Sequence, residues 1–242
     1  MTSGDLVEIG ESYGLWDDHI EHLQENRSIE KLWPPQTQAL DEGATDDVNF
    51  LMVSPPGTGK TLIAEIIAVN EWVSSGNPAV YLVPYVALAQ EKYDDFDQHL
   101  DDEMGLDIEK ATETDYPNPA ELFESQIIVM TYEKFDYYLR NYPDYVSEIS
   151  CAIVDEFHMV SDNTRGPNLE VAITDLMMNH PDVRIVGLSA TTPNPEAVSD
   201  WLSGSFSHSP DWRHNELHEG ICLIKSGKSG SMQMVNRSGL RT

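Results

Sequence analysis

The chain has few cysteines, few basic residues and no long apolar run. Cys151 and Cys222 are its only cysteines, so neither a disulfide framework nor a cysteine-rich metal site is expected, and Cys151 lies in an apolar run that predicts a buried thiol. The N-terminus lacks the apolar core of a secretion signal, and no apolar segment approaches membrane-spanning length. We therefore expect a cytoplasmic protein with no membrane partner.

Basic residues are scarce against a large excess of acidic ones. The chain has 14 Lys and Arg against 42 Asp and Glu, a formal net charge of -28. A plain nucleic-acid binder usually shows a basic surface, so this balance counts against simple electrostatic binding. The acidic residues are scattered along the whole chain, which suits a protein working in very high salt, where screening weakens self-repulsion. We favour a halophilic source over a specialised acidic protein. Nucleic-acid binding would then depend on backbone donors, helix N-termini and a few local cations.

Apolar runs alternate with amphipathic helical patterns along most of the chain. At 242 residues with 40% hydrophobic content, it can hold one α/β domain plus extensions. Strands are expected at 49–53, 79–83, 127–131, 151–155 and 184–189, with a short edge strand within 106–110. Helices are expected at 60–74, 86–100, 132–141, 168–179 and 195–203. Apolar strands separated by helices predict a three-layer α/β domain with a mostly parallel sheet and helices on both faces.

The run from Ser54 to Thr61 has the composition of a phosphate-binding loop, and it follows a strand and opens a helix. Gly57 and Gly59 let backbone N–H groups converge on phosphate oxygens. Lys60 is placed to reach the β- and γ-phosphates, and the Thr61 hydroxyl is a ligand for Mg²⁺. The strict pattern begins with Gly, and Ser54 is a small replacement. The residues expected to bind nucleotide here are Pro56, Gly57, Thr58, Gly59, Lys60 and Thr61.

An acidic pair follows the apolar run 151–154. Ligands bind at the carboxyl ends of strands in parallel α/β sheets, where Asp155 and Glu156 are expected. Asp155 would hold Mg²⁺, directly or through water, and Glu156 would act as the general base on the attacking water. With Lys60, these two residues form the predicted catalytic set, and ATP and Mg²⁺ are the predicted cofactors.

Several further runs, in order, resemble the DExH-box helicases of superfamily 2, most closely the branch of archaeal DNA-repair helicases and exosome RNA helicases. The run Leu32–Leu40 resembles the Q motif, Val83–Tyr93 motif Ia, Thr131–Lys134 motif Ib and Ser189–Thr191 motif III. The runs Arg165–Glu170 and Asp211–Arg213 are also typical of this branch. The resemblance covers residues 28–222 and implies a RecA-like fold.

The resemblance implies roles for residues outside the phosphate loop. Gln36 would read the adenine edge, for which its amide offers a donor and an acceptor. Contacts to the nucleic-acid backbone are implied for Pro84, Ala87, Leu88, Thr131, Arg165 and Gly166. Coupling of the nucleotide site to strand movement is implied for His158, Ser189, Ala190 and Thr191. Phe157 replaces the family's usual Ile and is expected simply to pack. Backbone contacts do not decide between DNA and RNA, and the branch and the halophilic interpretation favour DNA.

The expected domains are an N-terminal polar extension at 1–27, the first RecA-like helicase domain at 28–205, and an interdomain connection with a flexible basic tail at 206–242. The tail has no acidic residue after Glu219, and it is Ser/Gly-rich from Ser226 to Ser231. Three interpretations of it stay open: a solvated tail, a functional basic arm, and a truncated or shifted reading frame.

The family's later motifs do not follow Thr191, although these helicases place ATP between two RecA-like domains. We expect weak ATP binding, little hydrolysis and no unwinding by this polypeptide alone, unless a second RecA-like domain is supplied in trans. Two alternatives stay open: a nucleotide- or nucleic-acid-binding module without catalysis, or the remnant of a truncated helicase gene. A AAA+ or transport ATPase is a further reading, against which the Q motif and Ser189–Thr191 both argue.

Overall fold

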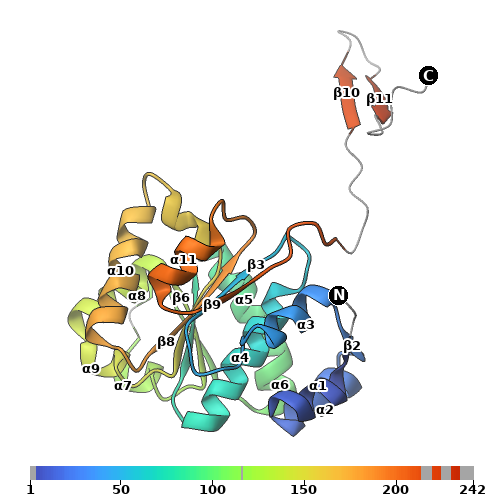
Figure 1. Ribbon diagram of the computed structural model, residues 1–242. Coiled ribbons are helices and arrows are strands. Elements are labelled where there is room, and N and C mark those ends of the chain that lie inside the picture. Colours follow the sequence, from blue (N-terminus) through green and yellow to red (C-terminus); the bar gives the residue numbers. More distant parts are fainter. Residues whose placement is uncertain (1–3, 116, 214–219, 225–229, 235–242) are drawn as a thin grey trace. The chain divides into compact units, whose positions relative to one another are not determined.

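The computed structural model describes residues 4–115, 117–213, 220–224 and 230–234 (Figure 1). The chain divides into two compact units, residues 1–212 and residues 213–242. Among the described residues, no helix has both the length and the apolar character needed to cross a bilayer.

The first unit is built on a sheet of seven strands in the order β5-β6-β4-β7-β8-β3-β9, and every pairing is parallel. Its strands are β3 (Phe50–Val53), β4 (Ala79–Val83), β5 (Ile108–Ala111), β6 (Ile127–Thr131), β7 (Cys151–Val154), β8 (Arg184–Ser189) and β9 (Ser205–His208). The predicted α/β fold with a mostly parallel sheet is confirmed, including the edge strand β5. The edge strand β9 was not predicted, because its sequence, Ser-Phe-Ser-His, is short and polar.

Side chains of each strand alternate between two core clusters, one on each face of the sheet. In β3, Phe50 and Met52 join the first cluster, whereas Leu51 and Val53 join the second. Helices packed into the first cluster are α1 (Leu6–Tyr13), α2 (Asp17–Glu25), α3 (Pro34–Asp41), α4 (Lys60–Ser75) and α5 (Val86–Phe96). Helix α5 continues into a π-helical turn, Asp97–Asp101, and the short α6 (Asp102–Met104).

The second cluster lies under the helices that come later in the chain, on the left of Figure 1. These are α7 (Pro119–Leu122), α8 (Tyr132–Asn141), α9 (Pro143–Val146), α10 (Gly166–Asn179) and α11 (Pro195–Leu202), with a 3₁₀ turn at Phe157–Ser161. Helix α11 shows how the sequence starts such a helix: Asn194 Oδ1 accepts from the Ala197 amide, and Pro195 occupies the first turn. Cys151 is buried in β7 with a free thiol, as expected.

The segment before residue 28 packs into the first core cluster. Its buried apolar side chains are Leu6, Ile9, Leu15, Ile20 and Leu23. Its first residues also pair with the domain, because β1 (Gly4–Asp5) lies antiparallel to β2 (Lys31–Leu32). The boundary near residue 27 stays a prediction, but this segment is a packed part of the unit and not a separate polar extension. The composition is misleading here because acidic residues cover its exposed side.

The second unit contains a hairpin, in which β10 (Gly220–Ile224) pairs antiparallel with β11 (Gly230–Met234). The predicted flexible run from Ser226 to Ser231 lies mostly outside the described residues, and its end belongs to β11, where regular pairing replaces the expected flexibility. Residues 225–229 and 235–242, which carry the tail cations, also lie outside the described part.

Candidate nucleotide and nucleic-acid site

The phosphate loop connects β3 to α4 at the carboxyl end of the sheet. Gly57 and Gly59 have φ angles of +73° and +77°, which residues with side chains adopt only at a cost. Thr58 is buried, and its hydroxyl donates to the Pro55 carbonyl at 2.8 Å and lies 2.7 Å from the Ser54 hydroxyl. Hydrogen bonds of the buried Thr58 hydroxyl therefore stabilise the loop, while Pro56 and Gly57 are exposed at its tip.

Lys60 lies where the loop carbonyls, the acidic pair and the start of α4 meet. Its Nζ donates to the carbonyl oxygens of Ser54 and Pro55 at 2.9 and 3.2 Å. Burial lowers the pKa of Lys60, and the nearby charges of Glu156 and Asp155 oppose part of that effect. A partly desolvated ammonium beside flexible glycine backbone suits a phosphate ligand.

The Asp155 carboxylate and backbone carbonyl accept three hydrogen bonds. Its Oδ2 accepts from the Tyr81 hydroxyl at 2.8 Å, its Oδ1 accepts from the Glu156 amide at 2.8 Å, and its backbone carbonyl accepts from the Tyr132 hydroxyl. Glu156 has a φ of +51°, an uncommon conformation for a residue with a side chain and one that recurs at functional sites. His158 Nδ1 lies 3.3 Å from Glu156 Oε2, an ion-pair distance without hydrogen-bond geometry.

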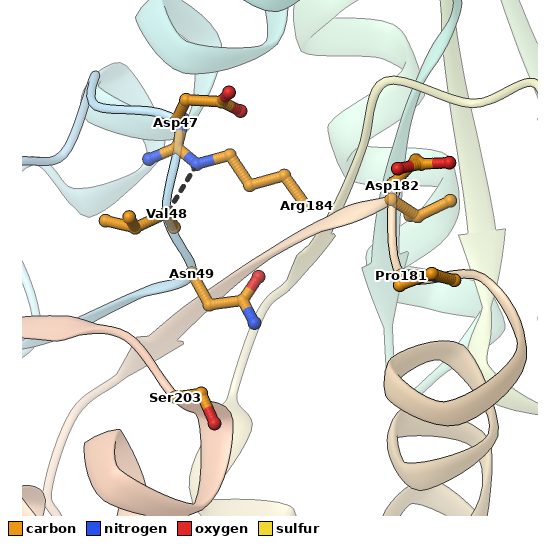
Figure 2. A pocket seen from close by; sticks show the side chains of 8 residues that line it. Asp47, Val48, Asn49, Pro181, Asp182, Arg184 and Ser203 are labelled. Carbon is orange, nitrogen blue, oxygen red and sulfur yellow. Dashed lines mark hydrogen bonds between the residues drawn. The ribbon is translucent and has the colours of Figure 1, made fainter.

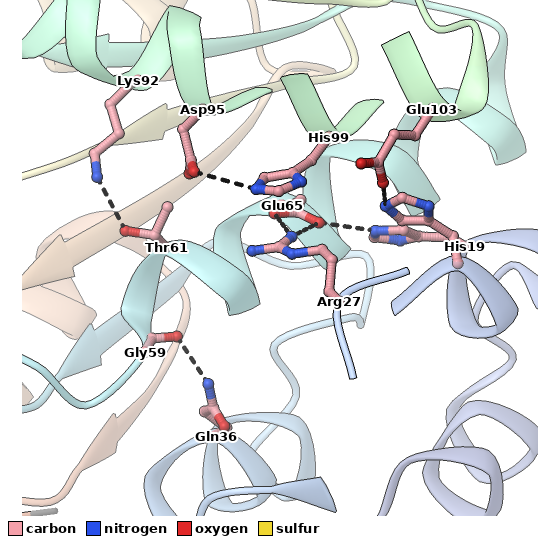
Figure 3. Close-up of polar contacts among 11 residues, drawn as sticks. His19, Arg27, Gln36, Gly59, Thr61, Glu65, Lys92, Asp95, His99 and Glu103 are labelled. Carbon is pink, nitrogen blue, oxygen red and sulfur yellow. Dashed lines mark hydrogen bonds and ion pairs between the residues drawn. The ribbon is translucent and has the colours of Figure 1, made fainter. Parts of the chain in front are cut away.

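The residues expected to hold Mg²⁺ present hard oxygen donors. Thr61 Oγ1 accepts from Lys92 Nζ at 3.3 Å (Figure 3), and the half-buried Asp155 carboxylate keeps acceptor capacity beyond its two bonds. Within the described residues, no group of three or more His, Cys, Asp or Glu side chains is arranged to hold a metal. A hydroxyl and a carboxylate fit Mg²⁺ bound mainly by phosphate and water, as is usual for this ion.

Gln36 is buried, and both ends of its amide are bonded to protein. Nε2 donates to the Gly59 carbonyl at 3.1 Å (Figure 3), and Oε1 accepts from the Trp33 amide at 2.7 Å. A Cβ on Gly59 would lie 2.1 Å from Gln36 Nε2. Gln36 therefore supports the phosphate loop in this structure, and its predicted contact with adenine stays a prediction.

Motif III lies beside the phosphate loop. The Ser54 amide donates to the Ser189 carbonyl at 3.0 Å, and the fully buried Ser189 hydroxyl donates to the Thr191 carbonyl at 2.9 Å. Ala190 is half-buried and Thr191 is exposed. Motif III therefore lies next to the phosphate loop, while the coupling role of these residues and of His158 stays a prediction.

Arg165 joins motif Ia to motif Ib. Its guanidinium donates to the Pro84 carbonyl, stacks 4.5 Å from the centre of the Tyr85 ring, and lies 3.7 Å from Glu133 Oε1. Tyr85 and Ala87 are exposed at the start of α5, whereas Leu88 is half-buried and Pro84 is buried. The predicted nucleic-acid residues thus meet at one place, but Arg165 has protein partners there.

Thr131 and Gly166 have structural roles in this structure. Thr131 is fully buried, and its hydroxyl caps α8 by accepting from the Lys134 amide at 3.4 Å. A Cβ on Gly166 would lie 2.2 Å from the Val160 carbonyl oxygen, so this glycine lets α10 approach the 3₁₀ turn. The strand contacts predicted for both residues stay untested. Phe157 packs as expected, against Gly187 and the Trp201 ring.

Three residues at the site were missed. Tyr81 and Tyr132 bond to Asp155, and Lys92 bonds to Thr61. The signal for Tyr81 was a hydroxyl within an otherwise apolar strand run. Lys92 belongs to the motif Ia run, where it was one of the chain's few cations.

A pocket of about 530 Å³ lies at the amino ends of the strands, opposite the phosphate loop. It surrounds the segment that leads into β3 and the start of β8 (Figure 2). Arg184 lines it and is buried. Its guanidinium donates to the carbonyls of Val48 and Ala44, at 2.7 and 2.8 Å, and to Glu71 Oε1 at 2.5 Å. Arg184 therefore connects β8 to the segment before β3 and to α4.

Comparisons with known proteins agree with this geometry. Residues 33–198 match the family model of the DEAD/DEAH box helicases. Similar proteins include the ATP-dependent DNA helicases Hel308 of Pyrococcus horikoshii, 41% identical over 85% of this chain, and of Thermococcus kodakarensis, 39% identical over 85%. This chain spans only 28% and 18% of their lengths.

The fold is also similar to solved helicase structures. The DUF1998 helicase MrfA bound to DNA superimposes with a TM-score of 0.67 at 21% identity, over 81% of this chain and 30% of MrfA. The phosphate loop, the acidic pair and motif III thus lie within residues 33–198, which match the family model, and within a fold shared with a solved helicase. The chain belongs to the DEAD/DEAH box helicase family, and its first unit is the N-terminal RecA-like domain.

Proposed function

We propose that this chain binds ATP with Mg²⁺ and contacts the backbone of DNA, as the ATP-binding domain of an ATP-dependent DNA helicase. One observation carries the proposal: the carboxyl ends of three strands bring the expected nucleotide-site residues together. These residues are Lys60 and Thr61 after β3, Asp155 and Glu156 after β7, and Ser189 at the end of β8.

Each residue has a definite task in this proposal. The Lys60 ammonium exchanges its loop carbonyls for the β- and γ-phosphates, which are stronger acceptors because they are charged. Thr61 and Asp155 hold the cation, and the Glu156 carboxylate accepts a proton from the attacking water. Bound Mg²⁺ supplies charge stabilisation on the phosphoryl oxygens.

The substitution Lys60→Ala tests the nucleotide site. We expect affinity for fluorescent Mg-ATP to fall by at least about 10-fold, since a charge-assisted hydrogen bond is lost. Lys31→Ala removes an exposed lysine elsewhere and should leave affinity unchanged. Equal affinity of the Lys60→Ala protein and the wild type would refute the proposed site.

Hydrolysis and unwinding are proposed to need a second RecA-like domain. An arginine finger from such a domain is worth about 10³–10⁵ in rate. The four arginines of the first unit all bond to protein groups: Arg27, Arg140, Arg165 and Arg184. The chain alone should therefore bind ATP with little turnover, and adding the second domain of a relative in trans should restore it. Rapid DNA-stimulated turnover by the 242-residue chain alone would contradict this.

DNA is proposed to contact the exposed start of α5. Support comes from the exposed Tyr85 and Ala87, because the free amides of a helix N-terminus bind phosphate without a net cation. Ala87→Glu should weaken single-stranded DNA binding in fluorescence anisotropy, while Val171→Glu adds the same charge to the exposed face of α10 and should not. Equal loss in both variants would point to net charge instead. An RNA strand of the same sequence decides whether DNA is preferred.

We propose a halophilic source, which the acidic composition supports, and a cytoplasmic location for this protein. With a net charge of -28, self-repulsion should destabilise the fold at low ionic strength. The melting temperature should therefore rise steeply with KCl concentration. A melting temperature independent of KCl would contradict the halophilic proposal.

A further inference from the structure

Tyr81 is a polar residue in an otherwise apolar strand. It lies in β4, between β6 and β7, and its side chain is fully buried in the first core cluster. A buried hydroxyl is costly unless it is hydrogen-bonded, so its partners show what it does. Its partners are the two residues expected to hold Mg²⁺.

This phenol lies next to both residues that are expected to hold Mg²⁺. The Tyr81 hydroxyl donates to Asp155 Oδ2 at 2.8 Å, and the Thr61 side chain lies close to the same phenol. Thr61 Oγ1 in turn accepts from Lys92 Nζ at 3.3 Å.

The Tyr81 ring packs against α5, the helix that also contains Lys92. Phe96 of α5 packs edge-to-face on it, with ring centroids 5.3 Å apart and an interplanar angle of 82°. The Asp155 backbone is fixed separately, because Tyr132 donates to its carbonyl and its amide donates to the Leu82 carbonyl at 2.8 Å. The Asp155 carboxylate is thus oriented by β4, and the Thr61 hydroxyl by β4 and α5 together.

We propose that Tyr81 is a positioning residue that sets the Thr61 hydroxyl and the Asp155 carboxylate at the spacing a divalent cation needs. The inference rests on the proposed Mg-ATP site and assigns to it a residue outside the motif runs named above. Groups that orient metal ligands typically change metal affinity about 10–100-fold when they are removed.

The same residue type elsewhere in the fold provides a matched control. Tyr138 is also buried, and its hydroxyl donates to the Pro117 carbonyl at 3.3 Å in the second core cluster. Both Tyr81→Phe and Tyr138→Phe remove one buried hydroxyl, and only the first removes it from the metal ligands.

The test compares the affinity for fluorescent ATP with Mg²⁺ and with EDTA in the 242-residue protein. We expect Tyr81→Phe to reduce the ratio of the two affinities by about 10-fold while the EDTA affinity stays unchanged. Tyr138→Phe should keep the wild-type ratio. Mn²⁺ binding to the nucleotide complex, followed by electron paramagnetic resonance, gives a readout independent of turnover, with the same ranking of the variants.

The outcomes separate this inference from the proposed function. An unchanged ratio in a folded Tyr81→Phe protein overturns the positioning role while ATP binding stands. Failure of the wild type to bind ATP with Mg²⁺ overturns both. If Tyr81→Phe does not fold, Phe96→Leu decides, because it keeps the phenol and removes the aromatic contact that holds its ring. A reduced ratio then supports the role, and a wild-type ratio overturns it.

Discussion

The Ser54 amide donates a hydrogen bond of 3.0 Å to the Ser189 carbonyl, and this bond joins the phosphate loop to motif III. It continues the pairing of β3 with β8, in which Val53 lies opposite Ser189. The link is made by the main chain, so it does not depend on either side chain. The Ser189 hydroxyl instead organises the residues after it, bonding with Thr191 and Thr192.

Ser189→Ala should separate these two contributions. It removes the hydroxyl bonds and keeps the backbone bond, so affinity for Mg-ATP should stay near the wild-type value while unfolding free energy falls by about 1–2 kcal/mol. Urea denaturation and nucleotide titration measure the two effects. Ser74→Ala, at an exposed helical site, is the control. A large loss of ATP affinity in Ser189→Ala would show that the hydroxyl, and not the main chain, supports the loop.

Glu65 anchors the N-terminal helices to the phosphate-loop helix (Figure 3). This buried carboxylate of α4 lies 3.0 Å from His19 Nε2 and 2.7 Å from Arg27 NH1. Glu65→Gln should lower the free energy of unfolding by about 3 kcal/mol, because a buried pair loses one partner. Urea denaturation measures the loss, and Glu170→Gln, on the exposed side of α10, should change little.

The same residue predicts a pH dependence. Burial raises the pKa of Glu65, but the hydrogen bonds and charges of His19 and Arg27 outweigh it, so the pKa lies below its usual value of 4.5. A lowered folded-state pKa stabilises the protein above the unfolded value, and this stability is lost as pH falls through the folded value. The difference in unfolding free energy between wild type and Glu65→Gln should therefore shrink below pH 4.5. A constant difference would contradict this origin.

Arg184 and Arg140 should differ strongly as stabilising residues. Arg184 is buried and bonds to Glu71 and two carbonyls, whereas Arg140 is exposed and pairs with Asp136 one turn earlier in α8. Arg184→Met should cost about 3 kcal/mol because it leaves a partly buried carboxylate and two carbonyls unpaired, and Arg140→Met about 0.5 kcal/mol. Thermal or urea denaturation ranks them. Similar costs for both would contradict the connecting role of Arg184.

Gly166→Ala tests the close contact between α10 and the turn after the acidic pair. A Cβ would lie 2.2 Å from the Val160 carbonyl oxygen, so we expect a loss of about 2–3 kcal/mol through displacement of the backbone. Gly105→Ala is the control, because its φ of +73° is strained for alanine but its Cβ would meet nothing, which predicts about 1 kcal/mol. A smaller cost at Gly166 than at Gly105 would contradict the contact.

Much of the first unit was predictable because local patterns and tertiary contacts agree there. Apolar runs became β3, β4, β6, β7 and β8 within one or two residues of the expected bounds, since strands buried on both faces must be apolar throughout. The edge strand β9 was missed because an edge position accepts polar residues. The buried side of the N-terminal helices was missed because scattered acidic residues dilute its apolar pattern.

The candidate site divides in the same way. Gly57, Gly59, Lys60, Thr61, Asp155 and Glu156 could be named from the sequence, because backbone freedom and charge at a strand end depend on local residue type. Three features could not be predicted from the sequence, because each depends on residues distant along the chain. They are the burial of Thr131, the protein partners of Arg165 and the role of Tyr81. Arg165 and Pro84, for example, are 81 positions apart.

The sequence by itself determined the fold class, the phosphate loop, the acidic pair and the order of the helicase motifs, since these follow from patterns along neighbouring residues. Only the tertiary structure decided which hydroxyls and cations face the site, because hydrogen bonds between strands and helices are set by packing. Tyr81 is the clearest case: it reaches Asp155 across 74 positions of sequence because β4 and β7 are neighbours in the sheet.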